Sequence, residues 1–291
     1  MCSALWGGAD MIAAGIGLNL LLGVAAYKKK AVTKGGAVSG VILGSLIFCS
    51  VGLLFWTLLG GFFISSTVMS RIGRRLKVKN EAINERGSVR DLVQVAANGG
   101  AALIAALLYQ AGLMLDMAKI NGMNGELFFL TLFAAAFASA NADTWASELG
   151  VLSPVPPRSV LTWKQVEPGT SGGVSLAGSA AAFSGALLIA AQFYVLLRLY
   201  GFNAEAALPP AAAALAAGFV GSFIDSLLGA SFQGKYLCSA TGAYTERRWS
   251  EKMPNKLVNG CRFITNDAVN ALSSLLAAAA AGSLILFFWP G

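Results

Sequence analysis

Residues 36–69 read GAVSGVILGSLIFCSVGLLFWTLLGGFFISSTVM, an apolar run without a single charged side chain. A helix needs about 20 such residues to cross the hydrocarbon core of a bilayer. The run is therefore too long for one untilted span and short for two. We expect a tight helical hairpin that turns near residues 50–52, where a glycine interrupts the run.

The rest of the chain has the same character. Of its 291 residues, 56% are hydrophobic and 12% are charged, about half the charged fraction of a soluble domain. Further apolar runs of spanning length lie at about 9–27, 92–115, 127–145, 172–199, 209–230 and 267–289. We therefore predict an all-α transmembrane helix bundle of about eight spans, folded as a single integral-membrane domain over residues 1–291.

The basic residues predict the orientation of this bundle. With eight spans and both termini outside, 19 of the 21 Lys and Arg residues fall in inner loops, and only Lys119 and Arg198 fall outside. Such an excess marks the cytoplasmic side, so we expect the active face to be cytoplasmic. A bacterial-type plasma membrane is the expected location. The net charge of +7 then indicates contact with anionic lipid headgroups, and not a nucleic-acid partner.

Histidine is absent from the chain. This excludes catalysis by a Ser-His-Asp triad, by a Cys-His pair or by the helical two-histidine zinc motif. Phosphoryl transfer remains open, because it can proceed with carboxylates, basic residues and Mg²⁺. The four cysteines contain no close pair, so neither a disulfide framework nor a cysteine metal site is expected.

Ionisable groups inside spans are costly, by about 2.5–3.5 kcal/mol on insertion scales, and are functional candidates by default. Asp143 lies near the end of the fifth predicted span, Glu148 follows it, and Asp225 lies within the seventh. All are expected near the cytoplasmic side. Carboxylates that converge there could hold Mg²⁺, which prefers oxygen ligands and substrate phosphates.

Other polar residues near the same side have two interpretations. Asp91 and Asp267 could join the site, or they could only stabilise the starts of helices. Gln94 and Asn98 could contribute to the site, or they could hydrogen-bond neighbouring helices. Asn270 lies four residues after Asn266, at the start of the last span.

The segment EPGTSGGVS at residues 167–175 is the second strong feature. It is rich in glycine and hydroxyl groups, and the sixth predicted span begins within it. Glycines and backbone N–H groups at the start of a helix can bind phosphate, and Lys164 could add a cation. We therefore predict a phosphate-binding loop formed by Gly169, Thr170, Ser171, Gly172 and Gly173. Close helix packing is the alternative explanation of these glycines.

Several longer strings resemble an integral-membrane family known as domain of unknown function 92. They are ADTWASELG at 142–150, PRSVLTWKQVEPGTSGGVSLAG at 157–178, GSFIDSLLGASFQ at 221–233 and NDAVNALSS at 266–274. With FFISSTVMSRIGRRLK at 62–77 and VRDLVQVAANGG at 89–100, the resemblance spans nearly the whole chain. The family includes the phytyl-phosphate kinase of chloroplasts and cyanobacteria and animal transmembrane protein 19.

The resemblance implies a kinase that transfers a phosphoryl group from CTP or ATP to an isoprenoid monophosphate lipid. If the chain is such an enzyme, we expect Mg²⁺ to lie between Asp143 and Asp225. The residues that would complete or orient its shell are Asn98, Glu148, Asp267 and Asn270. The loop at 169–173 would hold the nucleotide phosphates, with Lys164 nearby.

One stretch departs from the family pattern. Residues 236–256 keep Thr245-Glu246-Arg247, but they contain only Cys238 where many members have a cysteine-rich insert and a histidine. A metal bound by that insert is therefore not expected here. Two other functions remain open: an ion-coupled transporter or flippase using Asp143 and Asp225, and a non-catalytic regulatory membrane protein.

Overall fold

The computed structural model describes residues 8–77, 89–239, 242, 244–250 and 253–288. Seven long helices account for most of them, and each is long and apolar enough to cross a membrane. They are α1 (Gly8–Lys28), α2 (Lys34–Lys77), α3 (Leu92–Met114), α4 (Gly125–Gly150), α5 (Leu176–Tyr200), α6 (Ala204–Ser231) and α7 (Asn266–Phe288). The predicted all-α polytopic membrane bundle is thus confirmed.

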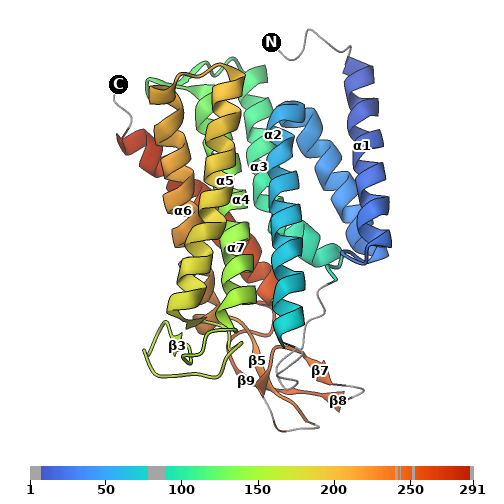
Figure 1. Ribbon diagram of the computed structural model, residues 1–291, viewed down its shortest axis with the longest axis vertical. Coiled ribbons are helices and arrows are strands. Elements are labelled where there is room, and N and C mark those ends of the chain that lie inside the picture. The colour runs from blue at the N-terminus through green and yellow to red at the C-terminus, as the bar shows by residue number, and fades with distance from the viewer. Residues whose placement is uncertain (1–7, 78–88, 240–241, 243, 251–252, 289–291) are drawn as a thin grey trace.

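Helix α2 is bent at Gly52. This residue has φ 76° and ψ 172°, a left-handed φ that glycine adopts without strain. The parts before and after Gly52 lie side by side and run in opposite directions (Figure 1). The bend agrees with the hairpin expected near residues 50–52. The number of membrane crossings stays a prediction.

Short strands occupy the connections between the helices. The connection from α3 to α4 contains β1 (Lys119–Ile120) and β2 (Met123–Asn124), and that from α4 to α5 contains β3 (Arg158–Ser159) and β4 (Gly173–Val174). The connection from α6 to α7 contains more strands than the other two. It contains β5 (Lys235–Leu237), β6 (Tyr244–Thr245), β7 (Trp249–Ser250), β8 (Met253–Pro254) and β9 (Lys256–Asn259), with the sheet order β6-β5-β9 and a β7-β8 hairpin.

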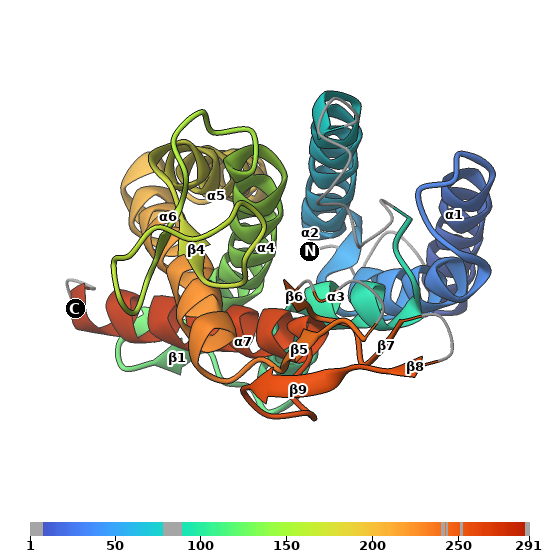
Figure 2. The ribbon, with the colours of Figure 1, turned by 90° about the horizontal axis from the view of Figure 1, so that it is seen from below.

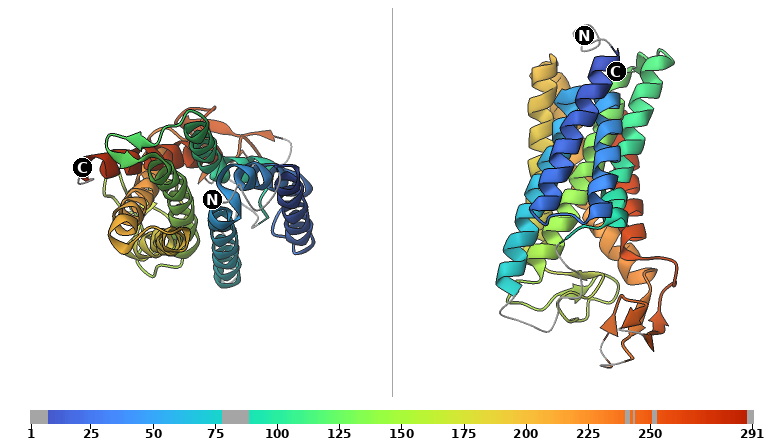
Figure 3. Two further views of the ribbon diagram at one scale, coloured as in Figure 1. Left: turned by 90° about the horizontal axis from the view of Figure 1, so that it is seen from above. Right: turned by 90° about the vertical axis from the view of Figure 1, so that its right-hand side faces the viewer.

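Strands β3 to β9 lie at one end of the bundle, and the start of α1 and the end of α7 lie at the other (Figure 1, Figure 3). Seen from the strand-bearing end, β5 and β9 lie beside α7, and β4 lies near α4 and α6 (Figure 2). We call this the strand end of the molecule. It corresponds to the inner face predicted from the basic residues.

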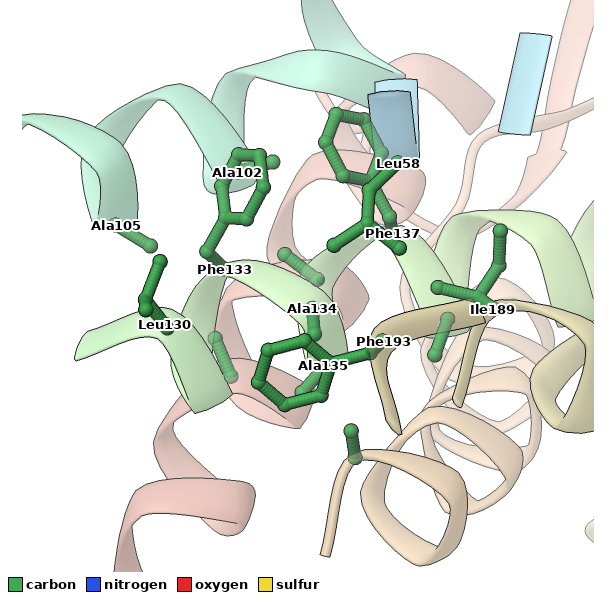
Figure 4. Close-up of a cluster of buried hydrophobic side chains, with 14 of the residues drawn as sticks. Leu58, Ala102, Ala105, Leu130, Phe133, Ala134, Ala135, Phe137, Ile189 and Phe193 are labelled. Atoms are coloured by element: carbon green, nitrogen blue, oxygen red, sulfur yellow. The ribbon is translucent and has the colours of Figure 1, made fainter. Parts of the chain in front are cut away.

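Helix α4 is the most buried of the long helices and packs against α2, α3, α5, α6 and α7. Its Phe133 and Phe137 are fully buried among Leu58, Ala102 and Phe193, which come from three other helices (Figure 4). Small residues let helices approach closely in a membrane bundle. A Cβ atom at Gly218 of α6 would lie 2.4 Å from Ala138 Cβ on α4, so only glycine fits at that crossing.

Two helix starts differ from the sequence prediction. Helix α5 begins at Leu176, because Gly173–Val174 pairs with β3 and Ser175 caps the helix by accepting a hydrogen bond from Gly178 N at 3.1 Å. Helix α6 begins at Ala204, five residues before the predicted start at 209. Asn203 caps it, accepting a hydrogen bond from Ala206 N at 2.8 Å. Both caps satisfy backbone donors that a helix start leaves unpaired.

Candidate functional site at the strand end

Asp143 and Asp225 meet at the strand end, although 82 residues separate them in the sequence. Asp143 lies two turns before the end of α4, and Asp225 lies at a similar depth in α6. Their carboxyl groups lie close enough to interact directly with each other. Both are half-buried. Because two adjacent carboxylates repel unless a proton or a cation lies between them, we call these two residues the carboxylate pair.

Helix α7 supplies two further polar groups to the pair. Ser273 Oγ donates to Asp225 Oδ2 at 3.0 Å. With its amide nitrogen turned toward the pair, Asn270 donates to the same oxygen at 3.0 Å, and its amide oxygen lies 3.3 Å from the Asn98 side chain on α3. Four helices thus contribute polar side chains to one small region.

This donor set fits Mg²⁺. The ion is typically held by one or two carboxylates, while water and substrate phosphates fill its other positions. Among the described residues, no group of three or more His, Cys, Asp or Glu side chains is arranged to hold a metal. Asp143 and Asp225 would therefore be the protein ligands, with Ser273 and Asn270 orienting Asp225. Asp267 and Glu148 do not join the pair in a metal-ligating group.

Glu148 lies instead where α4 meets α2 and the start of α3. A Cβ atom at Gly73 of α2 would lie 2.7 Å from Glu148 Oε2, and Glu148 attracts the guanidinium of Arg90. Arg90 is held between α2 and α3. It lies 5.8 Å and 5.7 Å from the ring centres of Phe62 and Phe63 and donates to Thr67 Oγ1 at 3.3 Å.

Burial lowers the pKa of Arg90 to about 10, and the nearby charge of Glu148 opposes this shift. A guanidinium with this pKa remains charged at neutral pH. Arg90 is therefore a permanent positive charge near the strand end. From sequence alone, it contributed only to the predicted topology of the chain.

Two of the open interpretations are now resolved for the start of α3. Asp91 Oδ1 accepts from Gln94 N at 2.9 Å, and Gln94 Oε1 accepts from Asp91 N at 3.2 Å. This reciprocal capping box satisfies two backbone donors at the helix start. Asp91 thus has the helix-stabilising role. Gln94 takes part in the cap, a role different from the two that the sequence left open, namely a place in the site or a bond to a neighbouring helix.

The loop at 169–173 packs against the end of α6. A Cβ atom at Gly172, whose φ is 81°, would lie 2.4 Å from Ala230 Cβ and 2.8 Å from Ser226 O. Ser171 Oγ donates to Gln233 Oε1 at 3.0 Å. These contacts favour the packing interpretation of Gly172. Gly173 lies in β4, so α5 begins at Leu176, directly after this segment but later than the start predicted at residue 172.

Lys235 joins this loop to the α6–α7 connection. Its Nζ donates to Ser171 O at 3.3 Å and to Ala230 O at 3.5 Å. Burial lowers the pKa of Lys235, while the carboxylate of Glu246 raises it. Glu246 is also close enough to act electrostatically on Asp225. Lys235 was missed as a site candidate, because nothing in its local sequence distinguishes it from other loop charges. Glu246 was noted only as part of the Thr245-Glu246-Arg247 motif, without a role in the site.

The remaining predicted residues lie near the strand end but outside the pair. Lys164 is exposed in the loop between β3 and β4, where its carbonyl accepts from Ser159 N at 2.9 Å. Asp267 lies in the first turn of α7 and lines a small polar cavity with Glu246 and Arg262. Their catalytic or metal-binding roles stay predictions.

Comparison with known proteins places the chain in a family. The family described as integral membrane protein DUF92 matches residues 17–278. Protein PGR of Arabidopsis thaliana is 30% identical over 272 residues, covering 89% of this chain and 91% of that protein. An uncharacterized membrane protein of Methanocaldococcus jannaschii, MJ0933, is 31% identical over 208 residues, covering 72% of this chain and 77% of its own length.

A more distant relative is the chloroplastic protein VTE6 of Arabidopsis thaliana. It is 23% identical over 238 residues, which cover 82% of this chain and 60% of VTE6. No solved structure matches. The match over residues 17–278 includes α2 to α6 and both aspartates of the carboxylate pair. The chain is therefore a member of the DUF92 family of integral membrane proteins.

Proposed function

We propose that this protein is a membrane kinase that transfers the γ-phosphoryl group of CTP or ATP to an isoprenoid monophosphate, in a reaction that requires Mg²⁺. The observation that carries the proposal is the carboxylate pair at the strand end of a membrane bundle. The resemblance of the surrounding motifs to phytyl-phosphate kinase supports the choice of reaction and substrate.

The chemistry suits the residues present. Phosphoryl transfer depends mainly on positioning and on stabilising the charge that develops on the phosphate oxygens. A monophosphate acceptor already carries a nucleophilic oxygen, so a chain without histidine needs no separate base. When bound, Mg²⁺ would neutralise charge on the transferring phosphoryl group. Asp143 and Asp225 would hold it, while Ser273 and Asn270 fix the orientation of Asp225.

The location suits a lipid acceptor. The carboxylate pair lies near one end of helices whose outer surfaces are apolar, with many exposed large hydrophobic side chains. An isoprenoid tail partitions into such surroundings, while its phosphate stays at the depth of the pair. The nucleotide would approach from the strand end, where the basic loops lie.

The test uses purified protein in detergent with phytyl or geranylgeranyl monophosphate, Mg²⁺, and CTP or ATP labelled at the γ-phosphate. We expect labelled isoprenoid diphosphate. Loss of residues that only orient a metal ligand costs about 10–100-fold, so Asp225→Asn, which removes a direct ligand, should lower the rate by more than about 100-fold. Asp116→Asn, the same substitution in the turn after α3 at the opposite end, is the control and should retain the rate.

Two results would contradict the proposal. One is a rate in Asp225→Asn equal to that of the unmodified protein. The other is the absence of diphosphate with any lipid monophosphate, combined with solute counterflow in liposomes, which would favour the transporter interpretation.

A further inference from the structure

A small polar cavity lies between the α6–α7 connection and the first turn of α7. Its volume is about 120 Å³, and its lining includes Gln233, Glu246, Arg248, Arg262, Asn266 and Asp267. Pockets for whole small molecules usually measure about 300–1,000 Å³. This cavity therefore has room for phosphate groups and a cation, but not for a complete nucleotide.

Gln233 is the most informative residue in the lining. It is only 2% exposed, and its Oε1 accepts a hydrogen bond from Ser171 Oγ. Its Nε2 makes no hydrogen bond with any described residue. Buried polar groups without a partner are rare in native proteins and call for an explanation, such as a ligand or an ion. An acceptor oxygen on a bound ligand would satisfy this donor.

The charges around the cavity indicate which ligand. Arg248 donates to the backbone oxygen of Arg262, and the Arg262 guanidinium lies 5.0 Å from the ring centre of Phe263. Guanidinium groups bind phosphate oxygens well, and the start of α7 adds the favourable field of a helix N-terminus. Because Glu246 and Asp267 also line the cavity, a phosphate that carries a divalent cation fits better than a bare anion.

The cavity is connected to the carboxylate pair. Glu246 is near enough to Asp225 to affect its charge. With its amide nitrogen turned toward the pair, Asn270 on α7 donates to the backbone oxygen of Asn266 at 3.0 Å as well as to Asp225 Oδ2 at 3.0 Å. A polyphosphate chain held in the cavity would thus have one end near the pair.

We propose that this cavity binds the Mg²⁺-complexed phosphate groups of the nucleoside triphosphate donor. The inference rests on the proposed function, and it moves the phosphate site from the loop at 169–173 to the α6–α7 connection. The loop has a supporting role in this arrangement: Ser171 fixes Gln233 through Oε1, which leaves Nε2 for the ligand.

The experiment measures binding of MgCTP, MgATP and magnesium pyrophosphate to the purified full chain by isothermal titration calorimetry, without a lipid acceptor. Gln233→Glu keeps the acceptor for Ser171 and replaces the Nε2 donor with an oxygen. Arg248→Gln removes an exposed charge and should not affect folding. Arg198→Gln, an exposed arginine of α5 at the opposite end, is the matched control. Thermal melting of each variant checks that it is folded.

We expect both cavity variants to raise the Kd by about tenfold or more, since hydrogen bonds to charged groups have effects of this size. Arg198→Gln should leave the Kd unchanged. Pyrophosphate should show the same pattern as the nucleotides, because the cavity holds phosphates and not the base.

The outcomes separate the two proposals. In one outcome, nucleotide binding weakens in the cavity variants but the protein phosphorylates no lipid. This would support the phosphate site in the cavity and contradict the kinase function. Lipid phosphorylation with an unchanged nucleotide KM in both variants would support the kinase function and contradict the phosphate site in the cavity. Failure of the unmodified protein to bind any of the three probes would also overturn the cavity.

Discussion

The hydroxyl of Ser273 on α7 donates a hydrogen bond to Asp225 Oδ2 at 3.0 Å. We expect Ser273→Ala to raise the Mg²⁺ concentration needed for half-maximal activity by about 10–100-fold, because partners that orient a metal ligand typically have this effect. Ser283→Ala on the same helix is the control. Its hydroxyl donates only within α7, to Ala279 O at 3.1 Å. Equal Mg²⁺ dependence in both variants would refute the role of Ser273.

Arg90 and Glu148 permit a second prediction about single residues. Removing one partner of a charge pair leaves the other charge without compensation. For a partly buried pair, we expect the loss of folding free energy to lie between that of exposed and that of fully buried pairs, at about 1–3 kcal/mol. We therefore expect Glu148→Gln and Arg90→Gln each to lower stability by about this amount in detergent unfolding. The double variant should lose less than the sum of the two. Additive losses would show that the two residues do not interact.

At the residue scale, the sequence identified the acidic residues that lie inside apolar spans. It did not identify the polar residues that take part with them in hydrogen bonds. Asp143 and Asp225 stood out because an acidic group within an apolar run needs an explanation, and the structure brings them together. Ser273 and Gln233 are ordinary polar residues in sequence. Their roles depend on partners that are distant in the chain, Asp225 on α6 and Ser171 in the loop before α5. Arg90 and Lys235 could not be distinguished from the other basic residues of the inner loops.

At the scale of whole elements, glycine positions decide how closely the helices pack. Gly218→Ala should destabilise the bundle by about 1–3 kcal/mol, the usual cost of overpacking, because its new methyl group would meet Ala138 on α4. Gly60→Ala on α2 is the matched control, since no atom lies within 4 Å of the place that its new methyl group would occupy. Thermal melting in detergent measures both. A melting temperature of Gly218→Ala no lower than that of Gly60→Ala would contradict the close α4–α6 crossing.

The helices themselves were largely predictable, because a long apolar run has few alternatives to a helix in a membrane. The bend at Gly52 was also expected. The starts of α5 and α6 were not, since hydropathy does not detect the pairing of Gly173–Val174 with Arg158–Ser159 or the cap formed by Asn203. The short strands of the α6–α7 connection were also missed, because each is only two to four residues long and carries no clear alternating pattern.

Strands β3 to β9 and most of the basic residues of the described chain lie at one end of the molecule, which predicts a cytoplasmic strand end. Cys261 is exposed at that end, before the start of α7. In a variant with Cys2, Cys49 and Cys238 replaced by serine, a membrane-impermeant thiol reagent should label Cys261 only after cells are permeabilised. A Glu205→Cys variant that also lacks Cys261 should be labelled in intact cells, because Glu205 lies at the opposite end. The reverse labelling pattern would show that the strand end lies outside the cell and would contradict the predicted topology.

For the whole molecule, we propose that the carboxylate pair supports Mg²⁺-dependent phosphoryl transfer to a membrane lipid. The most direct measurement is the initial rate of isoprenoid diphosphate formation as a function of Mg²⁺ concentration, for the unmodified protein and for Asp143→Asn. We predict no turnover in EDTA, full recovery when Mg²⁺ is restored, and a rate more than about 100-fold lower in Asp143→Asn at every Mg²⁺ concentration. Turnover that persists in EDTA, or an undiminished rate in Asp143→Asn, would contradict the account.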